Sequence, residues 1–93
     1  MNKSELVQEL AAHASIPNEE AATYVDIVFD SMRKTLQEGG RVEIRDFGTF
    51  HMKDYKGYAS RNPKTGEPVE VSPKRLPFFR AGTGLKEYIN END

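Results

Sequence analysis

Hydrophobic positions in the first half of the chain recur at the spacing of α-helices. Asn2 is suited to cap a first helix, and the apolar side chains after it stand three and four residues apart. A break at residues 15–18 precedes a longer periodic segment, which Gly39 and Gly40 end after about Gln37. The pattern therefore predicts two helices joined by a short loop. Their apolar positions are Leu6, Val7, Leu10, Ala11 and Ala14, then Ala21, Tyr24, Val25, Val28, Phe29, Met32 and Leu36.

The hydrophobic spacing changes to two after residue 40. Residues 41–44 (RVEI) and 49–55 (TFHMKDY) alternate apolar with polar positions around the turn sequence RDFG, which predicts a β-hairpin. Alternation returns in residues 67–71 (EPVEV), and an apolar strand is predicted over residues 75–80 (RLPFFR). A short helix over residues 85–90 (LKEYIN) closes the chain. The predicted order is ααβββα, which makes this an α+β domain.

Residues 55–75 contain too few apolar side chains to fold onto a core. Val69 and Val71 are their only aliphatic pair, and Pro68 and Pro73 flank it. Prolines disturb a central strand but are tolerated in an exposed ribbon. We expect two strands that run out and back, with residues 61–66 at the tip. Such a ribbon should project into solvent and be mobile until a partner orders it.

Length and composition indicate a single small domain, residues 1–93, in the cytoplasm. No apolar run approaches the roughly 20 residues that cross a membrane, and the N-terminal residues lack the apolar stretch of a secretion signal. The absence of cysteine excludes disulfides and thiolate metal sites. A chain of this length buries only a modest fraction of its surface, so oligomerisation is the simplest further source of stability.

Charge is distributed unevenly along the chain, although the net charge is only −2. Residues 1–50 hold five Lys/Arg and nine Asp/Glu, a net charge of −4. Residues 51–86 hold eight Lys/Arg and three Asp/Glu, a net charge of +5, and the last seven residues add −3. The basic segment fits either an electrostatic footprint for an anionic partner or an uneven solvated surface. Charge alone leaves both interpretations open.

Catalytic and metal-binding patterns are absent from the sequence. His13 and His51 have no carboxylate at motif spacing, and a lone histidine is most often structural. The Gly82–Gly84 segment is too short for a phosphate loop and is better explained by helix initiation. We therefore expect no enzyme, no cofactor, no metal site and no small-molecule substrate.

The basic ribbon suggests a nucleic-acid interface instead. Two strands that carry cations can lie along a DNA groove, where the cations meet phosphates. Pro63 then has two possible roles, because it suits a tight turn and is also an apolar wedge that can enter between base pairs. Arg61 and Asn62 suit the acceptor-rich floor of the minor groove. The cations of the ribbon are Lys53, Lys56, Arg61, Lys64, Lys74 and Arg75.

Five sequence segments together resemble the HU/integration host factor family of bacterial DNA-bending proteins. They are NKSEL (2–6), FGTF (47–50), RNPKTGE (61–67), the VEV that follows, and PFFRAGTGLK (77–86). The resemblance implies an intertwined dimer: a helical dimerisation body (residues 1–38), a β-saddle (41–81) with a projecting arm (about 55–75), and a C-terminal helix (83–90). It also implies a nucleoid-associated protein whose two arms wrap the minor groove of double-stranded DNA.

The resemblance further implies roles for individual residues. Pro63 matches the intercalating residue of the arm tip, and Arg61 and Asn62 match minor-groove contacts beside it. Phe47, Phe50 and Phe79 match the dimer core, which Phe29 should join, although Phe47 and Phe50 also suit the core of a monomer. The remaining expected DNA contacts are Lys3 at the flank and Lys53, Lys64, Lys74, Arg75, Arg80 and Lys86 on the saddle and arms.

Some positions depart from the family pattern. Tyr55 and Tyr58 stand where many relatives have arginines, and Thr83 stands where a lysine is common. The chain is also acidic overall, whereas relatives are usually basic. Fewer phosphate contacts predict weaker binding or a shallower salt dependence, although the tyrosines could still stack on sugars or donate hydrogen bonds.

Three functions agree with the sequence to different degrees. The first is a homodimer that bends or compacts duplex DNA with little sequence preference. The second is a site-specific subunit like those of integration host factor, which pair as heterodimers. The third is a dimeric scaffold that has lost most of its DNA affinity, motivated by the acidic first half and the missing arm arginines.

Overall fold

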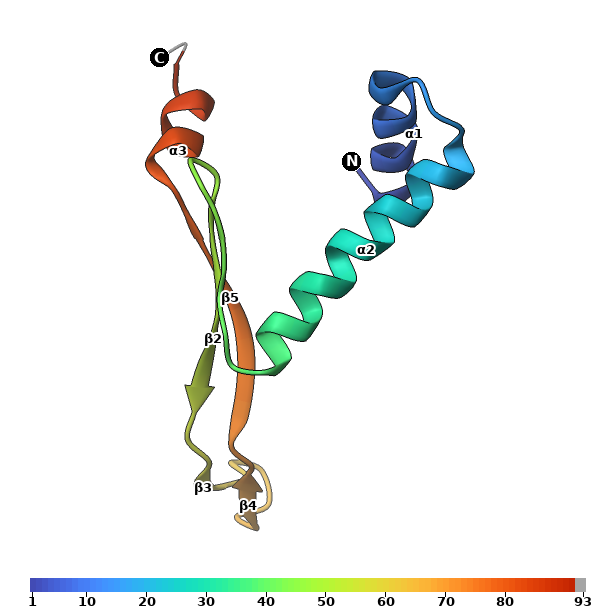
Figure 1. The fold of residues 1–93 in the computed structure, drawn as a ribbon. Coiled ribbons are helices and arrows are strands. Elements are labelled where there is room, and N and C mark those ends of the chain that lie inside the picture. Colours follow the sequence, from blue (N-terminus) through green and yellow to red (C-terminus); the bar gives the residue numbers. More distant parts are fainter. Residues whose placement is uncertain (92–93) are drawn as a thin grey trace.

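The computed structural model describes residues 1–91, so the last two residues of the predicted 1–93 domain lie outside the described part. Helices and strands both occur, and the predicted α+β class is confirmed (Figure 1). The elements are α1 (Lys3–Ala14), α2 (Asn18–Gln37), β1 (Val42–Ile44), β2 (Gly48–Tyr55), β3 (Tyr58–Arg61), β4 (Pro68–Val71), β5 (Lys74–Ala81) and α3 (Thr83–Ile89).

The strands number five instead of the three in the predicted order. The chain runs out to the tip through β2 and β3 and returns through β4 and β5, and each of these two long runs is interrupted. Residues 56–57 separate β2 from β3, and residues 72–73 separate β4 from β5. Pro73 has no N–H to donate to a ladder. Gly57 lies so close to the opposite strand that a Cβ there would stand 2.6 Å from the Val71 carbonyl oxygen. Both interruptions fall at the same level, where the three-stranded sheet ends and the two-stranded ribbon of β3 and β4 begins.

The two long helices pack against each other through small side chains. Asn2 Oδ1 accepts a hydrogen bond from the Glu5 backbone N–H at 2.8 Å, which starts α1 as the sequence predicts. Ala11 of α1 and Ala21 and Val25 of α2 are the buried apolar side chains among residues 1–91. The helix pair therefore has a narrow contact, and most of its larger apolar side chains remain uncovered.

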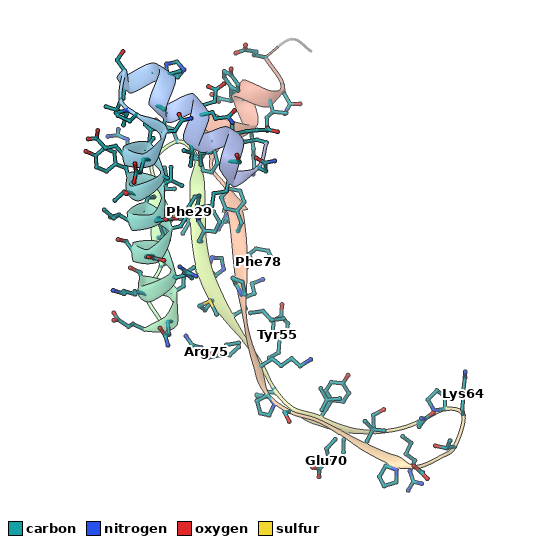
Figure 2. The ribbon with its side chains drawn as sticks, turned by 90° about the vertical axis from the view of Figure 1, so that its right-hand side faces the viewer. Phe29, Tyr55, Lys64, Glu70, Arg75 and Phe78 are labelled. Atoms are coloured by element: carbon teal, nitrogen blue, oxygen red, sulfur yellow. The ribbon has the colours of Figure 1, made fainter. Side chains whose placement is uncertain are left out.

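Strands β1, β2 and β5 form an antiparallel sheet in the order β1-β2-β5. Phe50 pairs with Phe79 and Met52 with Pro77, while the residues between them pair His51 with Phe78 and Lys53 with Leu76. Since neighbouring side chains of a strand alternate between faces, these two sets lie on opposite sides of the sheet. We call the Phe50/Phe79 side the α2-facing side and the His51/Phe78 side the outer face. Figure 2 shows Phe78 and Tyr55 directed away from α2.

A single chain exposes far more surface than a folded monomer of its size. Its accessible area is 8043 Å², whereas a monomer of 10.5 kDa is expected to expose about 5,400 Å². Its radius of gyration is 19.5 Å, against about 12 Å for a compact domain of this length. The helices, the sheet and the ribbon spread away from one another instead of enclosing a common core (Figure 1).

Arg75 joins the base of the arm to the end of α2. Its Nη2 donates to the Leu36 carbonyl at 3.3 Å and its Nη1 to the Gln37 carbonyl at 3.4 Å. Both carbonyls lie in the last turn of α2, where helical partners run out, although the Leu36 carbonyl also accepts from the Gly39 N–H at 3.1 Å. The Nε of Arg75 also lies 3.8 Å from Oδ1 of Asp54, its cross-strand neighbour. The guanidinium thus caps α2 from a residue 38 positions later in the chain.

Replacement of this cap should lower stability. We expect Arg75→Ala to reduce the free energy of unfolding by about 1 kcal/mol, since cationic donors at helix C-termini contribute up to about that amount. Urea unfolding followed by circular dichroism, at one fixed protein concentration, measures the change. Lys74→Ala is the matched control, because Lys74 is the adjacent cation on the outer face, and it should change stability by less than about 0.5 kcal/mol. An equal loss in both variants would contradict the capping role.

Candidate nucleic-acid interface

The arm is a two-stranded ribbon that has no core of its own. β3 and β4 pair in antiparallel register from Tyr58 opposite Val71 to Arg61 opposite Pro68. Every residue of the two strands is exposed except Val71, which is half-buried. Figures 1 and 2 show the ribbon extending beyond the end of the three-stranded sheet, away from both long helices. The ribbon is therefore available on both faces to a partner outside the chain.

The tip of the arm is closed by a hydrogen-bonded turn. Asn62 organises it: its backbone N–H donates to the Glu67 carbonyl at 2.9 Å, and its carbonyl accepts from the Gly66 N–H at 2.7 Å. Its side-chain oxygen accepts from the Lys64 N–H at 2.9 Å. Gly66 adopts a φ of +75°, which other residues rarely accept. The turn holds Pro63 at the exposed tip, where no hydrogen-bond donor is required of it.

The cations expected to contact DNA fall into two groups. Lys64 and Arg61 lie at the tip, where Arg61 Nη1 approaches the Gly66 carbonyl at 3.4 Å. Lys53, Lys74 and Arg80 share the outer face of the sheet with Tyr55, since their register positions alternate with those of the α2-facing side. Within residues 1–91, none of Arg61, Lys64, Lys74, Arg80 and Lys86 forms an ion pair.

Two expected contacts are engaged inside the chain. Lys3 Nζ lies 2.5 Å from Oδ1 of Asp26, an ion pair that ties the start of α1 to α2. Arg75 lies on the α2-facing side, where it caps the helix (Figure 2). Alternation along the strand already separates Arg75 from Lys74, but only the observed register says which of the two faces α2.

Aromatic side chains cluster on the α2-facing side. The ring centroid of Phe79 lies 4.7 Å from that of Phe50 and 5.7 Å from that of Phe47. Phe29 and Phe50 line a common groove beside α2, together with Met32 and Leu36. Phe29, Phe47 and Phe79 nevertheless remain 43%, 44% and 38% exposed. The structure thus brings the four predicted core phenylalanines to one side of the chain without covering them.

Two further exposed apolar residues on α2 were not assigned to an interface from the sequence. Ile27 and Val28 are 57% and 56% exposed, and a second apolar groove between α1 and α2 is lined by Leu6, Leu10 and Val28, among others. The available signal was the apolar run at positions 24, 25, 27, 28 and 29, which is wider than the stripe of a helix that packs on one side. At its edge, the Tyr24 hydroxyl donates to Glu20 at 2.5 Å, and this bond to a carboxylate raises the pKa of Tyr24 above 10.0.

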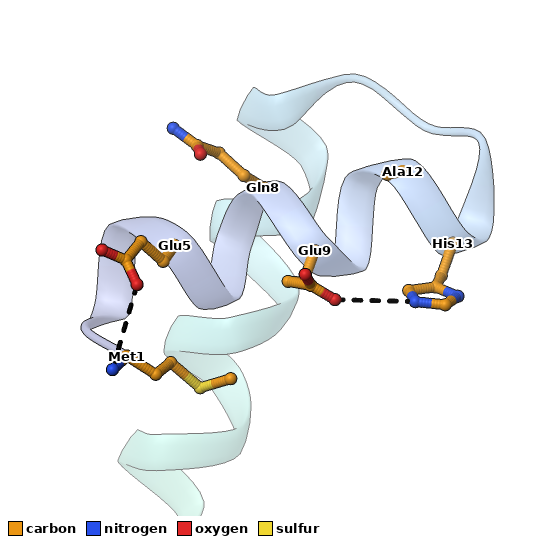
Figure 3. A pocket seen from close by; sticks show the side chains of 6 residues that line it. All are labelled: Met1, Glu5, Gln8, Glu9, Ala12 and His13. Atoms are coloured by element: carbon orange, nitrogen blue, oxygen red, sulfur yellow. Dashed lines mark ion pairs between the residues drawn. The ribbon is translucent and has the colours of Figure 1, made fainter.

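Two carboxylates of α1 lie far from the arm. Glu5 and Glu9 line a shallow hollow on the exposed side of α1, with Met1 and His13 (Figure 3). The N-terminal amine lies 3.9 Å from Glu5, and His13 Nε2 lies 3.6 Å from Glu9. Figure 1 shows α1 beside the N-terminal end of α2, at the opposite end of the molecule from the ribbon. These two carboxylates therefore do not oppose an anion at the arm tip.

Residues 1–91 hold neither a cluster of metal-ligand side chains nor a helix that could span a membrane. No three His, Asp or Glu side chains of this range are grouped as ligands for a metal ion. None of the helices described has both the length and the apolar character that crossing a bilayer requires.

Comparison with known proteins agrees with this geometry. The family model for "Bacterial DNA-binding protein" matches residues 1–90. DNA-binding protein HU-beta of Pseudomonas aeruginosa is 40% identical over 97% of this chain and 100% of its own length. Integration host factor subunit beta of Pseudoalteromonas atlantica is 41% identical over 99% of this chain and 97% of its own length. An Anabaena HU–DNA cocrystal structure superposes with a TM-score of 0.82 at 32% identity, covering 96% of this chain and 97% of that one. The chain belongs to the family of bacterial DNA-binding proteins that contains HU and integration host factor.

Proposed function

We propose that the protein is an architectural DNA-binding protein, which binds duplex DNA as a dimer through the minor groove and bends it. The observation that carries the proposal is the exposed ribbon, which has no core and ends in a hydrogen-bonded turn that presents Pro63. A ribbon of this kind gains little stability from packing within its own chain. We infer that its role is to contact a partner outside the chain.

Electrostatic attraction supplies the affinity in this proposal. The proposed phosphate contacts are cations of the outer face, the tip and α3 that have no ion-pair partner within the described chain: Lys64, Lys74, Arg80 and Lys86. Lys53 and, at the flank, Lys3 complete the set, while Tyr55 and Tyr58 contact sugars or donate hydrogen bonds. Each phosphate neutralised releases counterions, so binding weakens as salt rises. Arg75 is left out, because its guanidinium is directed to α2.

Pro63 acts as the wedge that stabilises the bend. Minor-groove proteins, a class that includes HU and integration host factor, insert apolar side chains between base steps and kink the duplex. Pro63 suits this step because it is exposed, apolar and held in place by the turn that Asn62 organises. Arg61 and Asn62 are proposed to contact the acceptors on the groove floor beside it.

Dimer formation is supported by the uncovered apolar side chains of the α2-facing side. In the proposed division, residues 1–38 form the dimerisation body, residues 41–81 the saddle with its arm at about 55–75, and residues 83–90 the final helix. The Phe29, Phe47, Phe50 and Phe79 side chains would meet the second chain. Obligate dimers bury interfaces of roughly 2,000–5,000 Å² in total, which suits the large excess of exposed area in one chain.

A site-specific role is the second candidate. The chain is as similar to an integration host factor subunit as it is to an HU protein, at 41% and 40% identity. A need for a second, unequal subunit to bind one sequence tightly would favour this candidate, whereas binding of the purified chain to unrelated duplexes favours the sequence-independent one. In both cases we place the protein with the nucleoid. A dimeric scaffold with weak DNA binding is the outcome if neither form binds at low salt.

The salt dependence of DNA binding should report the number of phosphate contacts. For duplexes of unrelated sequence, we expect the logarithm of the binding constant to fall linearly with the logarithm of salt concentration, by about 0.9 per neutralised phosphate. Lys74→Ala, present in both chains of the dimer, should make the slope shallower by about 2. Fluorescence anisotropy titrations at four salt concentrations measure both quantities. No binding at the lowest salt concentration would refute the DNA-binding function.

Removal of the Pro63 ring should reduce the DNA bend angle more than it reduces the number of phosphate contacts. We expect Pro63→Ala to reduce the bend angle, measured by energy transfer between dyes at the two ends of a duplex, and to weaken binding by roughly tenfold, or about 1.4 kcal/mol. Pro68→Ala is the matched control, because Pro68 is an exposed proline of the same arm that lies outside the tip turn. An unchanged bend angle in Pro63→Ala would remove the wedge from the mechanism.

Stability should depend on protein concentration if the dimer is obligate. We expect the thermal midpoint to rise as the concentration is raised from micromolar to hundreds of micromolar, because unfolding then separates two chains. Phe79→Ala should lower the free energy of unfolding by about 3 kcal/mol or more, since the ring contacts both Phe47 and Phe50. Calorimetry and sedimentation equilibrium test these expectations, and a midpoint independent of concentration would count against an obligate dimer.

A further inference from the structure

An aromatic cluster stands on the outer face of the sheet, separate from the phenylalanines of the α2-facing side. Phe78 is 42% exposed and lies directly across the strand pair from His51. The centroids of the two rings are 5.3 Å apart at an interplanar angle of 54°. Lys53 Nζ lies 3.8 Å from the centroid of the Phe78 ring, a cation–π contact. The Phe78 ring is therefore held between a second ring and an ammonium group.

No element of the described chain covers this cluster. Figure 2 shows Phe78 on the side of the sheet opposite α2, whereas the apolar grooves that suit a second chain lie between α1 and α2 and between α2 and β2. Leu76, two residues before Phe78 on the same face, is also 47% exposed. Phe78 and Leu76 thus form an exposed apolar patch away from the dimer grooves, and a patch of this kind can mark an interaction site.

The charges around Phe78 identify that partner as polyanionic. Arg80 follows Phe78 by two residues on the same face, and Lys53 pairs with Leu76, two residues before it. Two residues of a strand span about 7 Å, so the backbone positions that carry these two cations lie about that far from Phe78 in each direction along the sheet. The DNA minor groove is about 6 Å wide. Cations spaced in this way can reach the phosphates of both groove walls while Phe78 lies over the opening between them.

We propose that Phe78 is a further DNA-contacting residue, whose ring packs against the deoxyribose walls of the minor groove between phosphates bound by Lys53 and Arg80. Sugars present the least polar surface of the groove, and an aromatic ring buried against them contributes a hydrophobic term that salt does not screen. His51 and Lys53 act as positioning residues, since both hold the ring. This inference rests on the proposed DNA-binding function.

The contact also gives a physical reason for DNA binding by an acidic chain. Each arginine replaced along the arm removes one phosphate contact and its counterion release. An apolar contact on the saddle restores part of the affinity without adding charge. The binding free energy then has two contributions. The electrostatic contribution of Lys74 and Arg80 weakens as salt rises, whereas the hydrophobic contribution of Phe78 does not.

Salt titrations of three variants separate this proposal from its rivals. We expect Phe78→Ser to weaken duplex binding by about tenfold at every salt concentration, with the slope of log K against log salt unchanged. Phe78→Tyr keeps the ring and should bind within about twofold of the wild type. Tyr88→Ser, which removes an aromatic side chain that is 72% exposed on α3, is the matched control and should bind as the wild type does.

Direct contact is tested by nuclear Overhauser effects from the Phe78 ring protons to the sugar protons of a bound duplex. The inference is overturned if the wild type binds DNA but Phe78→Ser binds equally well, or if these Overhauser effects are absent. It is also overturned if Phe78→Ser dissociates the dimer or lowers its thermal midpoint enough to explain the lost binding, because the ring would then belong to the protein interface. If the wild type binds no duplex at low salt, the proposed function fails first, and the inference fails with it.

Discussion

The shortage of buried apolar surface within one chain is the constraint on which the rest of the structure depends. Three small side chains, Ala11, Ala21 and Val25, are all that residues 1–91 bury completely enough to be called a core. Hydrophobic burial is the main favourable term in folding, and so few buried groups cannot offset the conformational entropy of this many ordered residues. The rings of Phe29, Phe47 and Phe79 therefore make sense as half of a core that a second chain completes. An arm without a core is then compatible with a stable fold, because the contact between the two chains supplies the stability.

Much of the fold could be predicted from the sequence because the local signals agree with one another. Asn2, Gly39 and Gly40 mark helix ends, and alternation identifies the strands of residues 41–55 and 67–80. Two features could not be predicted, since both depend on contacts between distant segments. The cap that Arg75 forms on α2 joins residues nearly forty positions apart. The interruption between β2 and β3 depends on how closely Gly57 approaches the backbone at Val71, whereas the one between β4 and β5 follows the break predicted at residues 72–73.

The candidate site was predictable in kind but not in arrangement. Composition located the cations in residues 51–86, and the family resemblance identified the tip. Neither could state that Lys3 is paired with Asp26, or that Lys53 lies over the ring of Phe78. A list of basic residues therefore overstates the charge that is free to meet phosphates. The structure also places Glu5 and Glu9 of α1 at the opposite end of the molecule from the arm, so these carboxylates do not oppose an anion at the arm tip.

Phe78 and Phe79 are neighbours in β5, yet they serve opposite faces of the sheet. The Phe79 ring packs with the phenylalanines of the proposed dimer interface. The Phe78 ring packs with His51 on the face proposed for DNA. An insertion or deletion of a single residue in β5 before Phe78 would shift the register by one. Phe78 would then face α2, and Phe79 would face the surface proposed for DNA. The register of β5 against β2 therefore decides which ring faces α2 and which faces the surface proposed for DNA.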